Sequence, residues 1–186
     1  VTGIATDSRF VKPGNLFLPL NGNNFSGNEF CIEAITKGAC AIISCEMISN
    51  LTVPVIIVDD IQNELMRILD LFYQKPYNKL TLIGVTGTDG KTSVSTLTNY
   101  LLNHISSCAN IGTNGITYGN HVIDNLFTTP LLTENYRLLN EFANNNIAYV
   151  SMEVSSQGIA NNRIKGILYD CLLYTSDAAD DRISVD

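Results

Sequence analysis

A run of glycine, threonine and lysine near the middle of the chain has the composition of a phosphate-binding loop. Residues 84–92 read Gly-Val-Thr-Gly-Thr-Asp-Gly-Lys-Thr. Glycines let backbone N–H groups approach phosphate oxygens, a lysine can neutralise the β- and γ-phosphates, and a threonine hydroxyl can bind Mg²⁺. We therefore expect this loop to bind ATP and Mg²⁺. The residues predicted to contact the nucleotide are Gly87, Thr88, Asp89, Gly90, Lys91 and Thr92.

The spacing of these glycines differs from the commonest phosphate-loop pattern. That pattern, G-x-x-x-x-G-K-[ST], would require glycine at the position of Val85. The loop nevertheless follows an apolar, strand-like run at 80–85 and precedes a helical pattern at 92–104, which is the context that a phosphate loop requires. A tight strand-to-helix turn with an incidental lysine is the alternative, but three regularly spaced glycines and the Lys-Thr pair favour the phosphate loop.

A carboxylate is the second candidate for chemistry. Glu153 lies near the end of an apolar, strand-like run at 147–154. A solvated surface carboxylate is the ordinary explanation of a single glutamate. The position at the end of an apolar strand, in a chain with a phosphate loop, favours a metal role instead. The predicted metal ligands are Thr92 and Glu153.

The elements that must position these residues alternate between apolar runs and helical patterns. We expect helices at 29–37, 62–73, 92–104 and 133–144, and strands at 39–44, 54–58, 80–85, 107–111 and 147–154. Such alternation is typical of an α/β fold with a parallel sheet. The helical period breaks at Pro76, which predicts one domain over 1–76 and a second over 77–170.

Composition narrows the classes of function. The chain has 186 residues, 45% of them hydrophobic and 16% charged, which is typical of a globular protein. A formal net charge of −7 argues against nucleic acid as a partner. The five cysteines form no C-x-x-C pair, and no apolar stretch reaches membrane-spanning length. We expect a cytoplasmic protein without membrane insertion.

Several stretches together resemble the Mur ligase family and its folylpolyglutamate synthase relatives. The stretches are Thr6-Asp7-Ser8-Arg9, the loop Thr-Gly-Thr-Asp-Gly-Lys-Thr at 86–92, Thr128-Thr129-Pro130, and Met152-Glu153-Val154-Ser155-Ser156 with Arg163 following. They occur in the order found in the Mur ligases that add the third residue of the cell-wall peptide. The resemblance implies a small N-terminal α/β substrate-binding domain followed by an incomplete P-loop mononucleotide-binding parallel-sheet domain.

The resemblance also implies roles for single residues. Ser8 and Asn23, the latter within the loop 22–24, would hold the uridine diphosphate. Lys91 would be the catalytic residue that stabilises the transferred phosphoryl group. The muramyl-peptide substrate would contact Thr128, Thr129, Ser155, Ser156 and Arg163. Two departures from the family are Leu131, where many members are acidic, and Gln157 in place of a histidine.

The activity implied is an ATP-dependent ligation in peptidoglycan synthesis. The substrates would be UDP-N-acetylmuramoyl-L-alanyl-D-glutamate and an amino acid, joined through an acyl phosphate. The family's Asp-His segment, carboxylated lysine and C-terminal domain are not recognisable. We expect the chain to be a fragment, with an atypical tail of foreign sequence at 171–186, although 171–174 has the composition of the next strand.

Other functions fit parts of the same pattern. The chain could be a non-catalytic module that binds a nucleotide or UDP-sugar, or part of the dipeptide-adding Mur ligase, which shares the Asp-Ser-Arg start. A folylpolyglutamate synthase is disfavoured by that same start. A generic P-loop NTPase would explain the loop alone.

Overall fold

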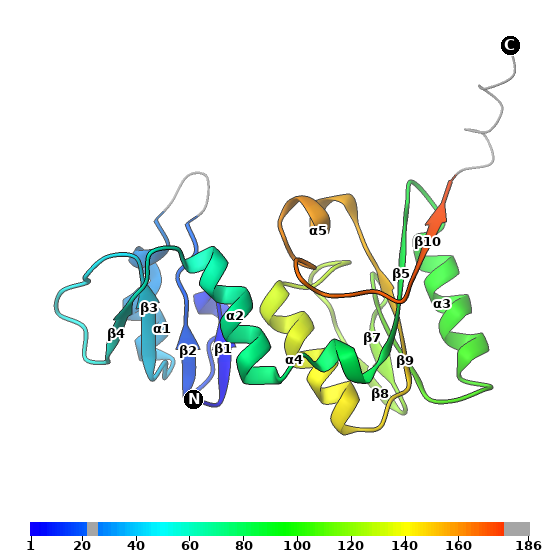
Figure 1. Cartoon of the computed structure of the whole chain (residues 1–186), viewed down its shortest axis with the longest axis horizontal. Helices are drawn as coiled ribbons and strands as arrows, with labels where there is room; N and C mark the ends of the chain where they lie inside the picture. Colours follow the sequence, from blue (N-terminus) through cyan, green and yellow to red (C-terminus); the bar gives the residue numbers. More distant parts are fainter. Residues whose placement is uncertain (22–25, 177–186) are drawn as a thin grey trace, which may run out of the picture. The chain divides into compact units, whose positions relative to one another are not determined.

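The computed structural model describes residues 1–21 and 26–176. The chain divides into two compact units, Val1–Gln74 and a second unit that begins at Lys75 (Figure 1). The predicted boundary, after residue 76, falls two residues later. Asn23, expected to bind the uridine diphosphate, lies outside the described residues, as does the part of the expected tail beyond residue 176.

The first unit is built on a four-stranded sheet in which all neighbouring strands are parallel, in the order β1-β2-β3-β4. The strands are β1 (Gly3–Ala5), β2 (Asn15–Phe17), β3 (Ala41–Ser44) and β4 (Val55–Ile57). The helices are η1 (Ser8–Phe10), η2 (Gly27–Phe30), α1 (Cys31–Thr36) and α2 (Ile61–Tyr73). Phe17, Ala34 and Ile42 are almost fully buried in its core.

Three features of this unit differ from the sequence prediction. The helix expected at 29–37 is a 3₁₀ turn, η2, followed by the short α1. Strands β1 and β2 were not predicted, because the apolar runs that contain them, 4–5 and 16–18, are shorter than the roughly four to eight residues that indicate a buried strand. Helix α2 begins one residue earlier than predicted, where the Asp60 carboxylate accepts hydrogen bonds from the N–H groups of Gln62 and Asn63.

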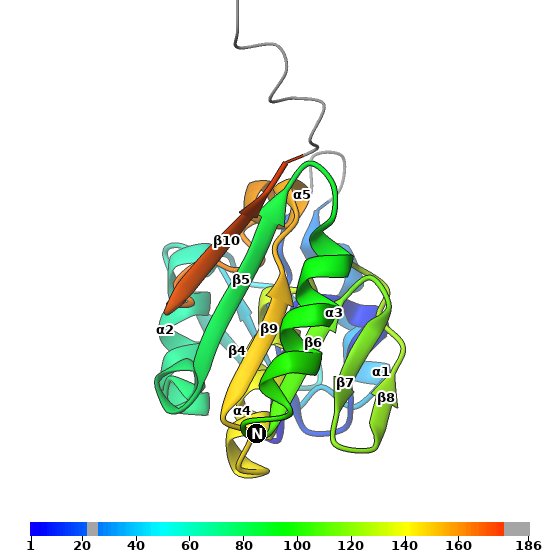
Figure 2. The ribbon, with the colours of Figure 1, turned by 90° about the vertical axis from the view of Figure 1, so that its right-hand side faces the viewer.

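The second unit is built on a six-stranded sheet in the order β10-β5-β9-β6-β7-β8. Its strands are β5 (Thr81–Gly87), β6 (Cys108–Gly112), β7 (Gly115–Tyr118), β8 (His121–Ile123), β9 (Tyr149–Glu153) and β10 (Cys171–Thr175). Its helices are η3 (Pro76–Lys79), α3 (Lys91–Leu102), α4 (Leu132–Asn144) and α5 (Ser156–Ala160). Helix α3 covers one face of the sheet, and α4 and α5 lie on the other (Figures 1 and 2).

Burial explains which strands of this sheet the sequence revealed. Leu82, Val85, Ile111, Val150 and Met152 on β5, β6 and β9 have no exposed surface. Strands covered by helices on both faces are apolar along their whole length, so they appear as unbroken hydrophobic runs. The strands predicted at 80–85, 107–111 and 147–154 are therefore confirmed as β5, β6 and β9.

The sheet contains the predicted parallel part, β10-β5-β9-β6, and adds an antiparallel part that the sequence did not predict. Strands β6, β7 and β8 form an antiparallel meander. The turns of this meander contain Gly115 and Gly119, both with positive φ. Its outer strand, β8, is largely exposed, so the sequence has no apolar run there. The first five residues of the expected tail form β10, which pairs in parallel with β5.

The strand order determines where the second unit can bind a ligand. After β5 the chain crosses by α3 to β6, whereas after β9, the neighbour of β5, it crosses by α5 to β10 on the other side of β5. Connections that leave in opposite directions open a crevice at the carboxyl ends of the strands. Within the described residues, no helix combines the length and apolarity needed to cross a membrane.

Candidate functional site

The loop between β5 and α3 has the backbone geometry of a phosphate loop. Gly87 has φ of 135° and Gly90 has φ of 77°, conformations that L side chains rarely adopt. Gly84 differs, because it lies inside β5 and its missing side chain makes room for Leu172 and Tyr169. Helix α3 begins at Lys91, so its first N–H groups, which have no partner within the helix, face the loop.

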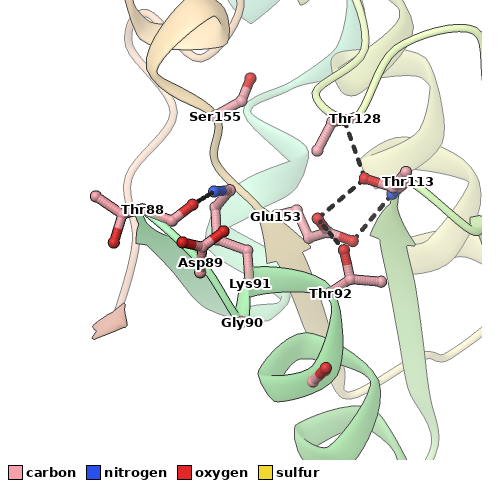
Figure 3. A pocket seen from close by; sticks show the side chains of 10 residues that line it. Thr88, Asp89, Gly90, Lys91, Thr92, Thr113, Thr128, Glu153 and Ser155 are labelled. Atoms are coloured by element: carbon pink, nitrogen blue, oxygen red, sulfur yellow. Dashed lines mark hydrogen bonds between the residues drawn. The ribbon is translucent and has the colours of Figure 1, made fainter. Parts of the chain in front are cut away.

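Two groups of this loop are engaged within the protein. The Lys91 ammonium donates to the Gly87 carbonyl at 2.7 Å. It also donates to the Thr88 carbonyl at 2.8 Å (Figure 3). The Thr88 N–H donates to the Thr175 carbonyl at 3.1 Å. Lys91 is half-buried and Asp89 is exposed. To contact a phosphate, the Lys91 ammonium would therefore have to leave these two carbonyls.

Glu153 lies opposite the loop at the end of β9, only 1% exposed. Its Oε2 accepts the Thr92 hydroxyl at 2.9 Å, which joins the two residues predicted to hold a metal. The N–H and hydroxyl of Thr113 donate to its Oε1 and Oε2 at 2.9 and 3.2 Å. A buried carboxylate is costly unless donors surround it, and here they come from α3 and the end of β6.

Thr113 was missed by the sequence prediction. It directly follows β6, in the turn that leads to β7. A threonine in a Thr-Asn-Gly turn is an ordinary turn residue, so its type gives no functional signal. Its place one residue beyond an apolar strand that neighbours β9 was the available clue.

Side chains from four segments line one cavity (Figure 3). Besides the loop, the cavity takes in Thr128 and Ser155, both predicted to contact the muramyl-peptide substrate. The Thr128 and Thr113 hydroxyls lie 3.0 Å apart. The complete lining is Thr88, Asp89, Gly90, Lys91, Thr92, Ser93, Thr113, Thr128, Glu153 and Ser155.

Thr129 is placed differently from its neighbour, because its side chain is fully buried. Its hydroxyl donates to the Glu153 carbonyl at 2.9 Å, accepts the Ser155 N–H at 3.0 Å, and lies 3.1 Å from the Ser155 hydroxyl. The Ser155 hydroxyl in turn caps α5 by accepting the N–H of Gly158. In this structure, therefore, Thr129 cannot present its hydroxyl to a substrate; it holds the β9–α5 junction in place.

Arg163 and Ser156 lie outside the cavity lining. The Arg163 guanidinium donates to the Thr129 carbonyl at 2.9 Å and its Cζ is 4.2 Å from the centre of the Phe127 ring. Partial burial lowers the pKa of Arg163, and its Nε is buried without a hydrogen-bond partner in the described part of the chain. Ser156 and Gln157 are exposed at the start of α5.

The remaining predicted residue, Ser8, belongs to the first unit and is 5% exposed. Its hydroxyl donates to Glu33 Oε2 at 2.7 Å, and Lys37 donates to Glu33 Oε1 and to the Ser8 carbonyl. These bonds from Lys37 and Ser8 lower the pKa of Glu33. Ser8 therefore fixes the η1–α1 packing, and its hydroxyl has a partner within the protein.

Two family models match the chain, and together they span most of it. Residues 1–73 match "Mur ligase family, catalytic domain", and residues 85–176 match "Mur ligase middle domain". The two matched segments correspond to the two structural units. The chain belongs to the Mur ligase family.

Curated relatives and solved structures extend this result. The UDP-N-acetylmuramoyl-L-alanyl-D-glutamate–2,6-diaminopimelate ligase of Gloeobacter violaceus is 35% identical over 95% of this chain and 36% of its own length. The UDP-N-acetylmuramyl-tripeptide synthetase 2 of Oceanobacillus iheyensis is 35% identical over 95% of this chain and 37% of its own. The chain thus spans little more than a third of these relatives.

The solved structures agree with the sequence relatives. A UDP-N-acetylmuramoyl-L-alanyl-D-glutamate–2,6-diaminopimelate ligase matches with a TM-score of 0.72 and 25% identity over 95% of this chain and 36% of its own. The MurF ligase from Thermotoga maritima in complex with ADP matches with a TM-score of 0.59 and 23% identity over 95% of this chain and 38% of its own, which shows a shared fold.

Proposed function

We propose that this chain forms the UDP-muramyl-binding and ATP-binding parts of a ligase that adds the third amino acid to UDP-N-acetylmuramoyl-L-alanyl-D-glutamate. The solved 2,6-diaminopimelate ligase supports this choice over the dipeptide-adding ligase, because it matches the chain with a TM-score of 0.72, against 0.59 for the MurF ligase. Several curated relatives carry 2,6-diaminopimelate in their names. The reaction belongs to peptidoglycan synthesis.

One observation carries the proposal: the Thr92 hydroxyl lies 2.9 Å from Glu153 at the helix end of the phosphate loop. A hydroxyl and a carboxylate that meet beside such a loop are what a metal–nucleotide complex needs. The cavity then continues to Thr128 and Ser155, which leaves room for a second substrate next to the phosphates.

Mg²⁺ fits the oxygen donors at the corner of the cavity where Thr92 and Thr113 meet Glu153, here called the Glu153 corner. Thr92 and Glu153 present hard oxygens, which Mg²⁺ prefers, and Mg²⁺ commonly uses one or two protein ligands together with waters and phosphates. The described residues contain no cluster of three or more His, Cys, Asp or Glu, so a cage made only of such side chains is not the arrangement here. Bound there, Mg²⁺ would neutralise charge on the β- and γ-phosphates.

In the proposed reaction the substrate carboxylate attacks the γ-phosphorus of ATP, and ADP leaves. The amine of the amino acid then attacks the acyl carbon of the resulting acyl phosphate, and inorganic phosphate leaves as the amide bond forms. Lys91 would move from the loop carbonyls to the phosphate oxygens and stabilise the transferred group. Because little covalent chemistry falls to the protein in phosphoryl transfer, positioning and charge neutralisation would be its main contributions.

The muramyl dipeptide would be oriented by Thr128 and Ser155 from the cavity and by Arg163 and Ser156 beside it. Thr129 would support these contacts through its buried hydrogen bonds to the backbone of Glu153 and Ser155. In the first unit, the segment around Ser8 and the loop containing Asn23 would hold the uridine diphosphate. We place the activity in the cytoplasm, in wall synthesis that supports cell shape and division; five cysteines without disulfides suit a reducing compartment.

Ligand binding by the 186-residue chain tests the proposal. A ligand that binds only the folded state must raise its melting temperature. We expect MgADP and UDP-N-acetylmuramoyl-L-alanyl-D-glutamate each to raise it, with the latter giving a larger shift than UDP alone. If the folded chain shows no shift with saturating UDP-muramyl dipeptide, the ligase assignment fails; a shift with MgADP alone would then indicate a generic nucleotide-binding unit.

A further inference from the structure

Thr113 contacts two sides of the cavity: Glu153, beside the phosphate loop, and Thr128, on the side proposed to bind the muramyl dipeptide (the substrate side). Through its N–H and its hydroxyl it donates to the two oxygens of Glu153, at 2.9 and 3.2 Å. The same hydroxyl lies 3.0 Å from that of Thr128 (Figure 3). Two donors from one residue to one carboxylate fix both the position and the plane of that carboxylate.

The hydroxyl protons give this chain of contacts a direction. A threonine hydroxyl has one proton to donate and two lone pairs to accept with. Because Thr113 uses its proton on Glu153 Oε2, the contact at 3.0 Å requires Thr128 to be the donor. The order is therefore Thr128 to Thr113 to Glu153. A ligand group that accepts the Thr128 hydroxyl proton would remove the hydrogen bond that Thr128 donates to Thr113.

The preceding residue, Gly112, completes the seat of Glu153. A Cβ added at Gly112 would lie 2.1 Å from Glu153 Oε1 and 2.8 Å from its Cδ. Gly112 is not among the glycines with positive φ, so the requirement is for space and not for an unusual backbone. Glu153 is thus held between the end of β6 and the start of α3.

We propose that Thr113 is a positioning residue that fixes the Glu153 carboxylate for the metal–nucleotide complex and couples it, through Thr128, to the substrate side of the cavity. This inference rests on the proposed function. Thr113 itself is exposed toward the cavity, so it can sense a ligand without leaving the carboxylate.

The first test measures how much Mg²⁺ strengthens ADP binding to the 186-residue chain, by calorimetry with Mg²⁺ and with EDTA. Thr113→Val keeps the N–H but removes the hydroxyl, and we expect it to reduce the Mg²⁺ enhancement roughly tenfold while binding in EDTA is unchanged, because a hydrogen bond to a charged group is lost. Thr113→Ser should retain the enhancement. Thr117→Val, on β7 away from the cavity, is the matched control. Equal enhancement in Thr113→Val and the wild type would overturn the proposal.

Coupling to the substrate side is measured with a double-mutant cycle. Thr128→Val, Thr113→Val and the double variant are compared for the Mg²⁺ enhancement of ADP affinity. We expect the effect of Thr128→Val to disappear when Thr113 is already valine. Fully additive effects would exclude the coupling through Thr113.

Amide hydrogen exchange in the ligand-free chain separates this inference from the proposed function. We expect the Thr113 N–H to be protected, and to lose that protection in Glu153→Ala, with Gly112→Ala showing the same loss because it displaces the carboxylate. Failure of the folded wild type to bind MgADP would overturn the proposed function and the metal–nucleotide part of this inference, but not the contact between Thr113 and Glu153 that hydrogen exchange measures. Rapid exchange of the Thr113 N–H in the folded wild type would overturn the positioning role, whatever the nucleotide data show.

Discussion

The phosphate loop and the Glu153 corner lie on opposite sides of one cavity, but they hold their charged groups differently. Glu153 is buried and accepts hydrogen bonds from Thr92 and Thr113, two residues that face a ligand site. Lys91 is bonded only to carbonyls of its own loop, among the contacts described. The corner is therefore preorganised, whereas the loop would have to rearrange in the proposed binding of a nucleotide. Preorganised groups lose little conformational freedom on binding, so we expect the Glu153 corner to keep its geometry when a ligand binds.

The largest effect is expected at Lys91, on the loop side. Lys91→Ala removes the only cation that lines the cavity within the described residues. We expect a loss of ADP affinity of roughly 100-fold, because charge-assisted bonds to phosphate disappear. Calorimetry of the variant measures this, with Lys79→Ala on η3 as the control. Unchanged affinity in Lys91→Ala would mean that the loop does not hold phosphates.

Stability should distinguish the adjacent threonines at the corner. Thr129→Val leaves the Ser155 N–H without its buried acceptor, so we expect unfolding to become easier by about 1–3 kcal/mol. Thr128→Val removes a half-buried hydroxyl at the cavity and should cost far less, while it weakens binding of UDP-muramyl dipeptide. Urea denaturation and thermal shift measure the two effects. Equal stability losses would show that both hydroxyls serve the fold.

Glu153→Gln tests the preorganised corner with almost no change in shape. The amide cannot accept at both positions, so one of the Thr92 and Thr113 contacts is lost. We expect the Mg²⁺ enhancement of ADP binding to fall about tenfold with little change in EDTA. An unchanged Mg²⁺ enhancement in Glu153→Gln would show that the metal ion binds elsewhere.

The smallest effect is expected from backbone strain in the loop. Gly90→Ala places a Cβ at φ of 77°, 4.0 Å from the Thr175 Cβ, and should cost about 1 kcal/mol of stability. Gly119→Ala, at φ of 54° with nothing within 4 Å, carries the same kind of strain far from the loop and is the matched control. Urea denaturation should show similar losses for both, but only Gly90→Ala should also weaken ADP binding. Equal ADP affinities of the Gly90→Ala and Gly119→Ala variants would show that ADP binding does not require glycine at position 90.

The sequence indicated the buried part of this architecture and the loop, for identifiable reasons. Strands β5, β6 and β9 are buried on both faces and therefore form apolar runs, and the Lys-Thr pair follows one of them. The exposed β8 and the three-residue β1 have no such signature. Sequence also could not tell Thr128 from Thr129, because which neighbouring side chain faces the cavity depends on how the loop meets β9.

Thr113 marks the limit of prediction most clearly. Its role depends on β6 lying next to β9, a pairing between residues about forty positions apart. No local pattern encodes that distance, and the residue type is common in turns. Thr92 and Glu153 were predicted as metal ligands because Thr92 begins a recognisable helix and Glu153 ends a recognisable strand, and the structure brings the Thr92 hydroxyl within 2.9 Å of the Glu153 carboxylate.

A crystal structure of the chain with ADP and Mg²⁺ tests the central claim most directly. We expect the phosphates at the start of α3, Mg²⁺ about 2.1 Å from the oxygens of Thr92 or Glu153, and the Lys91 ammonium moved from the loop carbonyls to the phosphates. A nucleotide bound elsewhere, or one bound here while Lys91 stays on Gly87 and Thr88, would contradict the account.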